Sequence, residues 1–447
     1  MNAGSKSLRH PAEREVPTAP GRLPVIGHGI AMLRGKLAFT AGLAAHGDIV
    51  RVHLGTLPVY FVTSAELIDQ VLATETDKFD KGALGDKLRD VFGNGLVSTN
   101  GDFYRRQRRM IQPAFHRRPI GRYTAMMAES AAELADSWRS GQVVDVERAM
   151  QDLALVIAGR SLFSLDFARE VRDVIRDEMP VMLRLGVVRA ITSTPLLERL
   201  PIPANRRFDR AIARVHAVVD RVAASAREDR DDLLSALVRA RDENGEPMSR
   251  EQVRDEVVTL LVGGSETTGN TLAWLFHELA AHPDVLDRVT AEVEEVVGTR
   301  PVAFEDLNAL PYTRRVVSEV LRRYPLWFML RRTNTTVSLG GVEFPPGTEI
   351  GFSTHAVHHD PRYHRDPDVF DPDRWLPERV GALPRGAYVP FAAGLHHCPG
   401  HFFAMAELMV VAATVLSRRR LVPVPGRPPR PRVTGLIYPG PLPMTVH

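Results

Sequence analysis

A single cysteine, Cys398, occurs in this chain of 447 residues, and it limits how the chain can fold. One thiol cannot form an internal disulfide, so this cysteine does not serve as a covalent staple. It lies in the segment Phe391–Gly400, whose sequence is Phe-Ala-Ala-Gly-Leu-His-His-Cys-Pro-Gly. Gly394 and Gly400 allow sharp turns and a close approach of the backbone to a flat group.

The residues after the cysteine predict a helix. Pro399 suits a first helical turn, and the run from His401 to Val411 is mostly apolar. Cys398 would then lie at a helix N-terminus, where free N–H groups and the helix dipole favour a thiolate. A buried thiolate can serve as an axial ligand of haem iron, where it promotes cleavage of the O–O bond.

The segment Phe391–Gly400 resembles the haem-binding loop of the cytochrome P450 monooxygenases. The shared pattern is a Phe, a small spacer, a Gly, a basic residue two positions before the Cys and a Gly two positions after it. The resemblance implies that Cys398 is the axial ligand of a haem b iron and that His396 contacts a haem propionate.

Two other interpretations of this loop remain open. A buried structural cysteine can also occupy a glycine-rich turn. The crowding of His396, His397, Cys398 and His401 also suggests zinc. Ligands so close in sequence cannot easily surround one tetrahedral ion, and no matching Cys or His pair occurs elsewhere, so zinc is disfavoured.

Composition is that of an ordinary globular chain, with 44% hydrophobic and 25% charged residues. Length alone suggests about three domains, but no Gly/Ser tract, long charge block or repeat supports a division. We therefore expect a polar extension over residues 1–16 and a single domain over 17–447. The resemblance extends from about Pro17 to Tyr438 and implies the cytochrome P450 fold, mainly α with small flanking β-sheets.

Charge and hydropathy patterning limit partners and location. A formal charge of +3 does not require nucleic acid, and no run approaches the roughly 18 apolar residues of a membrane span. The polar start lacks the apolar stretch of a signal peptide, which predicts a cytoplasmic protein. By its resemblance to the soluble bacterial type, the chain is expected to be a monomer that takes electrons from NAD(P)H through a ferredoxin reductase and a ferredoxin.

Hydrophobic periodicity places the main elements. Asp48–Gly55 and Pro58–Val62 alternate enough to predict a small sheet with a turn at Gly55. Helical patterns dominate from Ala65 to about Pro311. Strands return beyond Tyr324, including the run Val337–Phe344.

One long helix is predicted from about Arg250 to Ala281. Ser249 and Gln252 form a capping box at its start, and His282-Pro283 ends it. Gly263 and Gly264 lie in its middle, where each costs about 1 kcal/mol relative to Ala. Such glycines indicate a place where the backbone opens or where another group approaches closely.

Glu266 and Thr267 follow these glycines and resemble the acid–alcohol pair of the family's oxygen-binding motif. The resemblance implies that both residues are catalytic and deliver protons to bound O2. Glu in place of Asp is a variation found within the family. The other interpretation is a pair of packing glycines beside a solvated Glu.

Three further charged residues match a structural network of the family. Glu319 and Arg322 share a helix face at i and i+3, and Arg374 lies in a segment that resembles the third member's position. The resemblance implies that these three lock the core and are not catalytic. It also implies that Arg331, in preference to Arg332, contacts a haem propionate.

Residues 102–109 resemble the family's Trp-x-x-x-Arg helix, except that Tyr104 replaces the Trp. Arg108 keeps the charge, and both residues are expected to bind the haem propionates, Tyr104 through its hydroxyl. The surrounding arginines are expected to form a basic surface that docks an acidic ferredoxin; they are Arg105, Arg106, Arg109, Arg117 and Arg118.

By family position, four segments line a substrate pocket that contains no charged side chain. Its members are Phe92, Leu96, Leu261, Trp327, Phe328, Met329, Leu436 and Ile437. Such a pocket cannot pair a carboxylate or ammonium group, so a compact apolar substrate is expected.

The resemblance to bacterial terpene oxidases suggests a cyclic terpene such as pentalenene, oxidised in secondary (antibiotic) metabolism. A methyl group held there could be oxidised in successive steps. Fatty acids, steroids and macrolides remain alternatives. A haem sensor or a non-oxygenating haem-thiolate isomerase is the alternative of another class, and the intact Glu266–Thr267 pair favours the monooxygenase.

Overall fold

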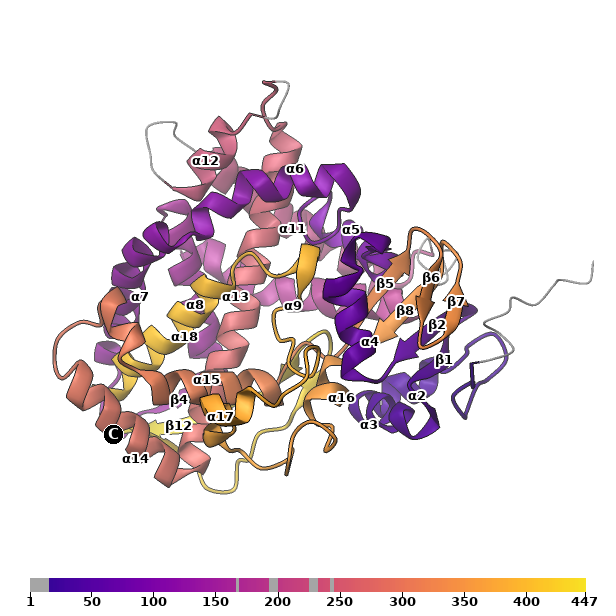
Figure 1. Cartoon of the computed structure of the whole chain (residues 1–447). Coiled ribbons are helices and arrows are strands. Elements are labelled where there is room, and N and C mark those ends of the chain that lie inside the picture. Colours follow the sequence, from indigo (N-terminus) through magenta and orange to yellow (C-terminus); the bar gives the residue numbers. More distant parts are fainter. Residues whose placement is uncertain (1–15, 166–168, 193–199, 225–231, 242–244) are drawn as a thin grey trace, which may run out of the picture.

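The computed structural model describes residues 16–165, 169–192, 200–224, 232–241 and 245–447. The predicted extension therefore lies, apart from Val16, outside the described residues. Helices form one large body, and a five-stranded sheet lies along one edge of it, on the right in Figure 1.

The longer helices are α5 (Gly82–Phe92), α6 (Gly101–Ile111), α7 (Arg117–Ser137), α8 (Val146–Phe163), α9 (Arg169–Thr192), α11 (Pro203–Ala224), α13 (Arg250–Ala281), α14 (Pro283–Val296), α15 (Pro311–Arg323) and α18 (His401–Leu416). The shorter ones are α2 (Gly29–Arg34), α3 (Lys36–Gly42), α4 (Ala65–Asp69), α12 (Leu233–Arg239), α16 (Thr354–His358) and α17 (Pro377–Val380). The mainly helical fold with small sheets agrees with the prediction.

The five-stranded sheet has the order β1-β2-β8-β5-β3. Its strands are β1 (Ile49–Leu54), β2 (Leu57–Val62), β8 (Glu349–Phe352), β5 (Met329–Thr333) and β3 (Phe79–Asp80). β1 and β2 form the predicted hairpin, with Ile49 opposite Val62. β5 runs antiparallel to β8 with Arg331 opposite Ile350, so the sheet holds that arginine in a fixed register.

The predicted strand run Val337–Phe344 is two strands, β6 (Val337–Leu339) and β7 (Val342–Phe344), paired as a hairpin. Gly340 and Gly341 form its turn with φ of 54° and 82°, which favours glycine. Short strands also interrupt the stretch that was predicted to be helical, namely β3 and β4 (Val143–Asp145). β4 pairs with β12 (Pro443–Val446), which also pairs with β9 (Leu421–Pro423).

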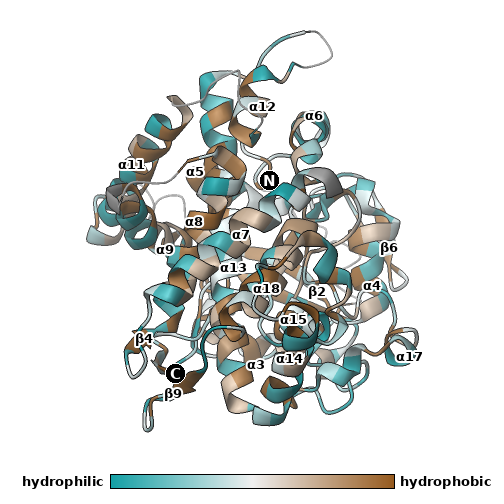
Figure 2. Cartoon of the chain, turned by 90° about the vertical axis from the view of Figure 1, so that its left-hand side faces the viewer, coloured by the Kyte–Doolittle hydropathy of each residue, from teal (hydrophilic) through white to brown (hydrophobic). Residues whose placement is uncertain are grey.

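Helix α13 is the longest element of the core, and its predicted capping box is present. Gln252 N–H donates to Ser249 Oγ at 3.2 Å, and Ser249 N–H donates to Gln252 Oε1 at 2.8 Å. The helix packs against α8, α11 and α18. Figure 2 shows α18 largely hydrophobic near the centre of the view, with hydrophilic residues frequent on outer helices such as α11. The segment after Cys398 is thus a core helix, as its composition predicts.

Candidate functional site

The segment around Cys398 is a tight loop that leads into α18. The Cys398 N–H donates to the Phe391 carbonyl at 2.9 Å, and the His397 N–H donates to the Gly394 carbonyl at 3.1 Å. Gly394 has φ of 60°, and a Cβ there would lie 2.1 Å from the Leu72 carbonyl oxygen. The close approach expected at this glycine is therefore made by the protein's own backbone.

The Cys398 thiol lies three residues before α18. Burial raises the pKa of the thiol, while a hydrogen bond from the Gly400 backbone and the charge of Arg108 lower it. The thiol is deeply enclosed, yet the residue as a whole keeps an accessible face. A donor atom of this kind is available to a ligand that enters the interior.

Cationic groups from three separate segments gather near this loop. Arg331 of β5 is 4% exposed, and burial lowers the pKa of its guanidinium to about 10. Its Nη1 donates to the Leu330 carbonyl at 2.8 Å, but its Nε has no partner among the described residues. A buried guanidinium with an unpaired donor fits an acidic group of a ligand, because leaving it unpaired is costly.

Lys81 adds a second cation that the sequence did not single out. Its Nζ donates to the carbonyls of Leu96 at 2.7 Å and Thr99 at 2.6 Å, and it lies 4.0 Å from the centre of the Tyr104 ring. Burial, followed by the charge of Arg331, lowers the pKa of Lys81 to about 7. Only its burial and the proximity of Arg331 distinguish Lys81, and neither can be recognised in the local sequence.

His396 completes the group. Burial, then Lys81 and Arg331, lowers the pKa of its imidazole to about 3. Each of these three basic groups thus disfavours a positive charge on the others. The two negative charges of a pair of carboxylates would relieve that repulsion. Two haem propionates supply such a pair, so these residues fit the cofactor that the resemblance implies.

Tyr104 and Arg108 hold the cysteine loop. The Tyr104 hydroxyl donates to the Leu395 carbonyl at 2.9 Å, and Arg108 Nη1 donates to the His397 carbonyl and, at 3.2 Å, to the Tyr104 oxygen. A phenol has one hydrogen to donate, so in this conformation Tyr104 has none left for a propionate. The contacts present make both residues positioning groups for the loop.

One face of α13 opens where the two glycines lie. Gly263 and Thr267 are exposed, one turn apart, in a helix whose neighbouring residues are mostly buried. A Cβ at Gly263 would meet nothing within 4 Å among the described residues, so packing within this part of the chain does not require a glycine there. The Thr267 hydroxyl donates to the Gly263 carbonyl at 2.5 Å. The surface left free at this point of the core suits a flat cofactor or a substrate.

The Glu266 side chain and the Thr267 side chain have different hydrogen-bond partners. Its carboxylate accepts a hydrogen bond from the Tyr438 hydroxyl at 2.7 Å. Burial raises the pKa of Glu266, the Tyr438 hydrogen bond lowers it, and the charge of Glu147 raises it further. The solvated Glu of the alternative interpretation does not occur, because Glu266 is 6% exposed.

Glu319, Arg322 and Arg374 are brought together. Glu319 and Arg322 are fully buried and joined by two hydrogen bonds of 2.8 and 2.9 Å, and Arg374 Nε lies 3.5 Å from Glu319. Trp375 Nε1 and the Asp371 N–H also donate to Glu319, at 3.0 and 3.1 Å. The network joins α15 to the segment that precedes the cysteine loop.

Most of the predicted pocket residues belong to two apolar clusters. Phe92, Leu96, Leu261 and Ile437 lie in the main helical core. Trp327 and Phe328 lie in the cluster beneath β1 and β2, while Met329 and Leu436 are partly buried. The backbone N–H of Trp327 donates to the Gly435 carbonyl at 3.3 Å, so the segments around these two residues lie side by side.

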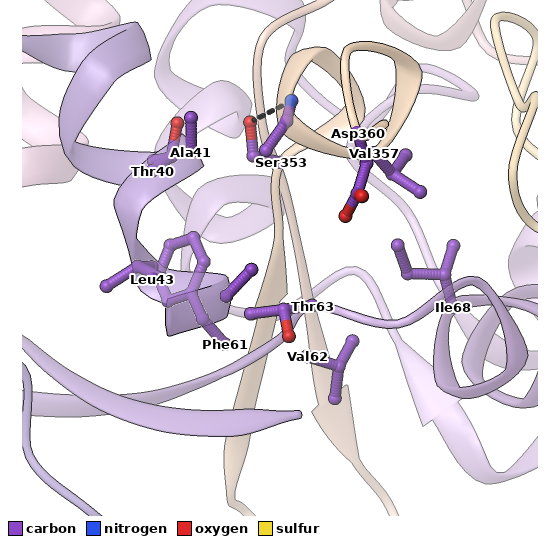
Figure 3. A pocket seen from close by; sticks show the side chains of 12 residues that line it. Thr40, Ala41, Leu43, Phe61, Val62, Thr63, Ile68, Ser353, Val357 and Asp360 are labelled. Atoms are coloured by element: carbon purple, nitrogen blue, oxygen red, sulfur yellow. Dashed lines mark hydrogen bonds between the residues drawn. The ribbon is translucent and has the colours of Figure 1, made fainter. Parts of the chain in front are cut away.

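A small cavity of about 20 Å³ lies elsewhere, between α3, β2 and α16 (Figure 3). Its walls include Phe61, Ser353 and Asp360, and none of the predicted site residues. Its volume holds about one water molecule, so it is not a substrate site.

Residues 17–445 match the cytochrome P450 family. The heme domain of cytochrome P450DA has a similar structure, with a TM-score of 0.83, 24% identity and 97% of both chains covered. That likeness confirms the predicted fold.

Curated relatives are more similar in sequence. Cyclooctat-9-en-7-ol 5-monooxygenase of Streptomyces melanosporofaciens is 44% identical, with 96% of this chain and 94% of the relative covered. Cyclooctatin synthase of the same organism is 40% identical (95% and 94% covered), and pentalenene oxygenase of Streptomyces avermitilis is 38% identical (94% of each).

The chain therefore belongs to the cytochrome P450 family, and it is a monooxygenase that uses haem iron, O2 and electrons from redox partners. No helix among the described residues is long and apolar enough to cross a membrane.

Proposed function

We propose that this cytochrome P450 monooxygenase oxygenates a cyclic terpene in secondary metabolism. The substrate class is inferred from the names of three relatives, which are 38–44% identical to this chain over nearly its whole length. Two of those names specify a cyclic terpene substrate. The predicted pocket residues agree with it, since each has an apolar side chain. A methyl group retained in such a pocket could undergo successive oxidation.

The proposed cofactor is haem b, with Cys398 as the axial ligand. When bound, thiolate-ligated haem supplies the activation of O2. Arg331 and Lys81 would neutralise its propionates, because these two buried basic groups repel each other, and the neutral imidazole of His396 would donate a hydrogen bond to one of them. Tyr104 and Arg108 would hold the loop that presents the thiolate.

Thr267 and Glu266 are proposed to deliver protons. Thr267 lies on the exposed face of α13 with its hydroxyl beside the Gly263 carbonyl. Glu266 precedes it in the helix, and burial raises the pKa of its carboxyl, which favours a group that can hold a proton and pass it on.

Electrons are proposed to come from NAD(P)H through a ferredoxin reductase and a ferredoxin, in the cytoplasm, with residues 17–447 acting as one monomeric domain. A surface groove of about 620 Å³ between α6 and α12 supports the ferredoxin, since an acidic partner complements its arginines. The arginines are Arg106, Arg109, Arg239 and Arg241. The side chains of Arg117 and Arg118 lie outside the described residues.

A binding and product assay tests the substrate class. Purified haem-loaded protein is titrated with cyclic terpenes, a fatty acid, a steroid and a macrolide, and the low-spin to high-spin shift of the haem spectrum is recorded. Turnover with a surrogate ferredoxin and reductase then identifies products. The proposal expects a spin shift and an alcohol product only with terpenes. Tight binding of a fatty acid with no response to any terpene would contradict it.

A further inference from the structure

The hydrogen bond between Glu266 and Tyr438 joins two elements that are distant in sequence. Tyr438 belongs to β11 (Ile437–Tyr438), and its hydroxyl donates to Glu266 Oε1 at 2.7 Å. Both residues are nearly inaccessible, at 6% and 7% exposure. A buried carboxyl that must receive protons needs a route to water, and the phenol is its hydrogen-bond partner.

The position of Tyr438 is fixed by α13 itself. Trp274 Nε1 and Asn270 Nδ2 both donate to the Ile437 carbonyl, at 2.6 and 3.1 Å. Two donors one turn apart on α13 therefore hold the strand against the helix that carries Glu266. The backbone that carries Tyr438 is therefore held beside the part of α13 that carries Glu266.

From Tyr438 the chain leads outward through a short hairpin. β11 forms a hairpin with β10 (Arg432–Val433), in which Arg432 is opposite Tyr438. Thr434 lies in the turn of this hairpin and is only half-buried, and its side chain is among the groups that lower the pKa of the Tyr438 hydroxyl. At the same edge, Arg432, with 64% of its side chain exposed, lies 3.3 Å from the carboxylate of Glu147.

We propose that Thr434 and Tyr438 form the proton route from solvent to Glu266. A water molecule gives a proton to the Thr434 oxygen, the Thr434 hydroxyl proton passes to the Tyr438 oxygen, and the Tyr438 proton passes to Glu266 Oε1. Each hydroxyl accepts one proton and releases one, so no oxidant or other reactant is needed. The inference rests on the proposed role of Glu266 in proton delivery.

The surrounding charges favour this direction of transfer. Glu266 faces Tyr438 and, further away, Glu147, and no cation is among the groups that shift its pKa. Burial followed by the Glu266 charge raises the pKa of Tyr438. The tyrosine therefore stays protonated and acts as a donor to the carboxylate, which is the state that a relay requires between transfers.

The test uses the haem-loaded enzyme with Tyr438→Phe, Thr434→Val and Thr434→Ser. Tyr388→Phe is the matched control, because Tyr388 is also buried and its hydroxyl donates to one carbonyl, that of Ser318, at 3.1 Å. Product formed per reduced cofactor is measured together with the solvent isotope effect. The infrared C=O band of the Glu266 carboxyl, assigned by its loss in Glu266→Gln, is followed against pH.

Tyr438→Phe and Thr434→Val should each lower coupled turnover about tenfold or more, with substrate affinity unchanged; the full loss of a general acid costs ~10²–10⁴-fold. In Tyr438→Phe the Glu266 carboxyl band should persist to higher pH, because the hydrogen bond that lowers its pKa is gone. Thr434→Ser and Tyr388→Phe should couple as the wild type does.

Normal coupling in both Tyr438→Phe and Thr434→Val, with Glu266→Gln uncoupled, would overturn the route and leave the role of Glu266 intact. Normal coupling in Glu266→Gln as well would instead overturn the proposed role of Glu266. Loss of coupling in Tyr438→Phe alone would reduce Tyr438 to a positioning residue and contradict the route through Thr434.

Discussion

Replacement of Arg331 by Met should affect the haem-free and haem-loaded proteins in opposite directions. The guanidinium is buried with an unpaired Nε, and its pKa falls from 12.5 to about 10 because of burial. At ~1.4 kcal/mol per pKa unit, this shift corresponds to a burial cost of about 3 kcal/mol. The folded-state pKa is the lower one, so the cost is fully present below about 10, including at neutral pH.

In the haem-free protein, Arg331→Met should therefore raise the free energy of unfolding by about 1–3 kcal/mol, with part of the gain lost to imperfect packing. In the haem-loaded protein the same change removes a charge-assisted hydrogen bond of about 1.5–3 kcal/mol, so haem should dissociate about 10- to 100-fold faster. Urea unfolding measures the first quantity, and transfer of haem to an acceptor apoprotein measures the second.

Arg332→Met is the matched control, since it changes the next residue of the same strand. Arg332 is ion-paired with Asp86 at 2.8 Å and with Glu349 at 2.6 Å, so its loss should destabilise the haem-free protein. If Arg331→Met destabilises the haem-free protein as Arg332→Met does, or retains haem as the wild type does, the reasoning about an unpaired buried cation is wrong.

Three further outcomes are expected. Glu319→Gln should lower the free energy of unfolding by about 3–5 kcal/mol in urea titrations, because it leaves the fully buried Arg322 without a counter-charge; a loss below 1 kcal/mol would contradict this. Thr267→Ala should leave haem and substrate spectra unchanged but divert reduced cofactor to peroxide, and unchanged peroxide yield would remove Thr267 from proton delivery. Lys81 has a pKa lowered from 10.5 to about 7, so the haem-free protein should gain stability as pH rises from about 7 towards 10.5; Lys81→Met should flatten that dependence, measured by urea unfolding at several pH values.

Local sequence patterns were sufficient to predict the helices and strands that carry most of the site residues. The capping box at Ser249 and Gln252 starts α13 where the sequence predicts, since both hydrogen bonds involve residues three apart. The β1–β2 hairpin also follows from alternation and a glycine turn. The Val337–Phe344 run was predicted as a strand region, and its two strands pair across a turn at Gly340 and Gly341, which can adopt positive φ.

Contacts between distant segments could not be predicted in this way. Glu266 and Tyr438 are 172 positions apart, and the local sequence of neither residue indicates the other. Lys81 appears in sequence as an ordinary charged residue before a helix. Its lowered pKa arises from burial and from Arg331, which is brought to it by the pairing of β3 with β5.

The most direct test of the central claim is the spectrum of the reduced protein with carbon monoxide. Thiolate ligation by Cys398 predicts a strongly red-shifted Soret band in the wild type, and Cys398→Ala should lose both that band and turnover. Tyr388→Phe, which leaves the loop contacts in place, should keep the band. Purified wild-type protein that binds no haem, or a Cys398→Ala variant that keeps the red-shifted band, would contradict the account.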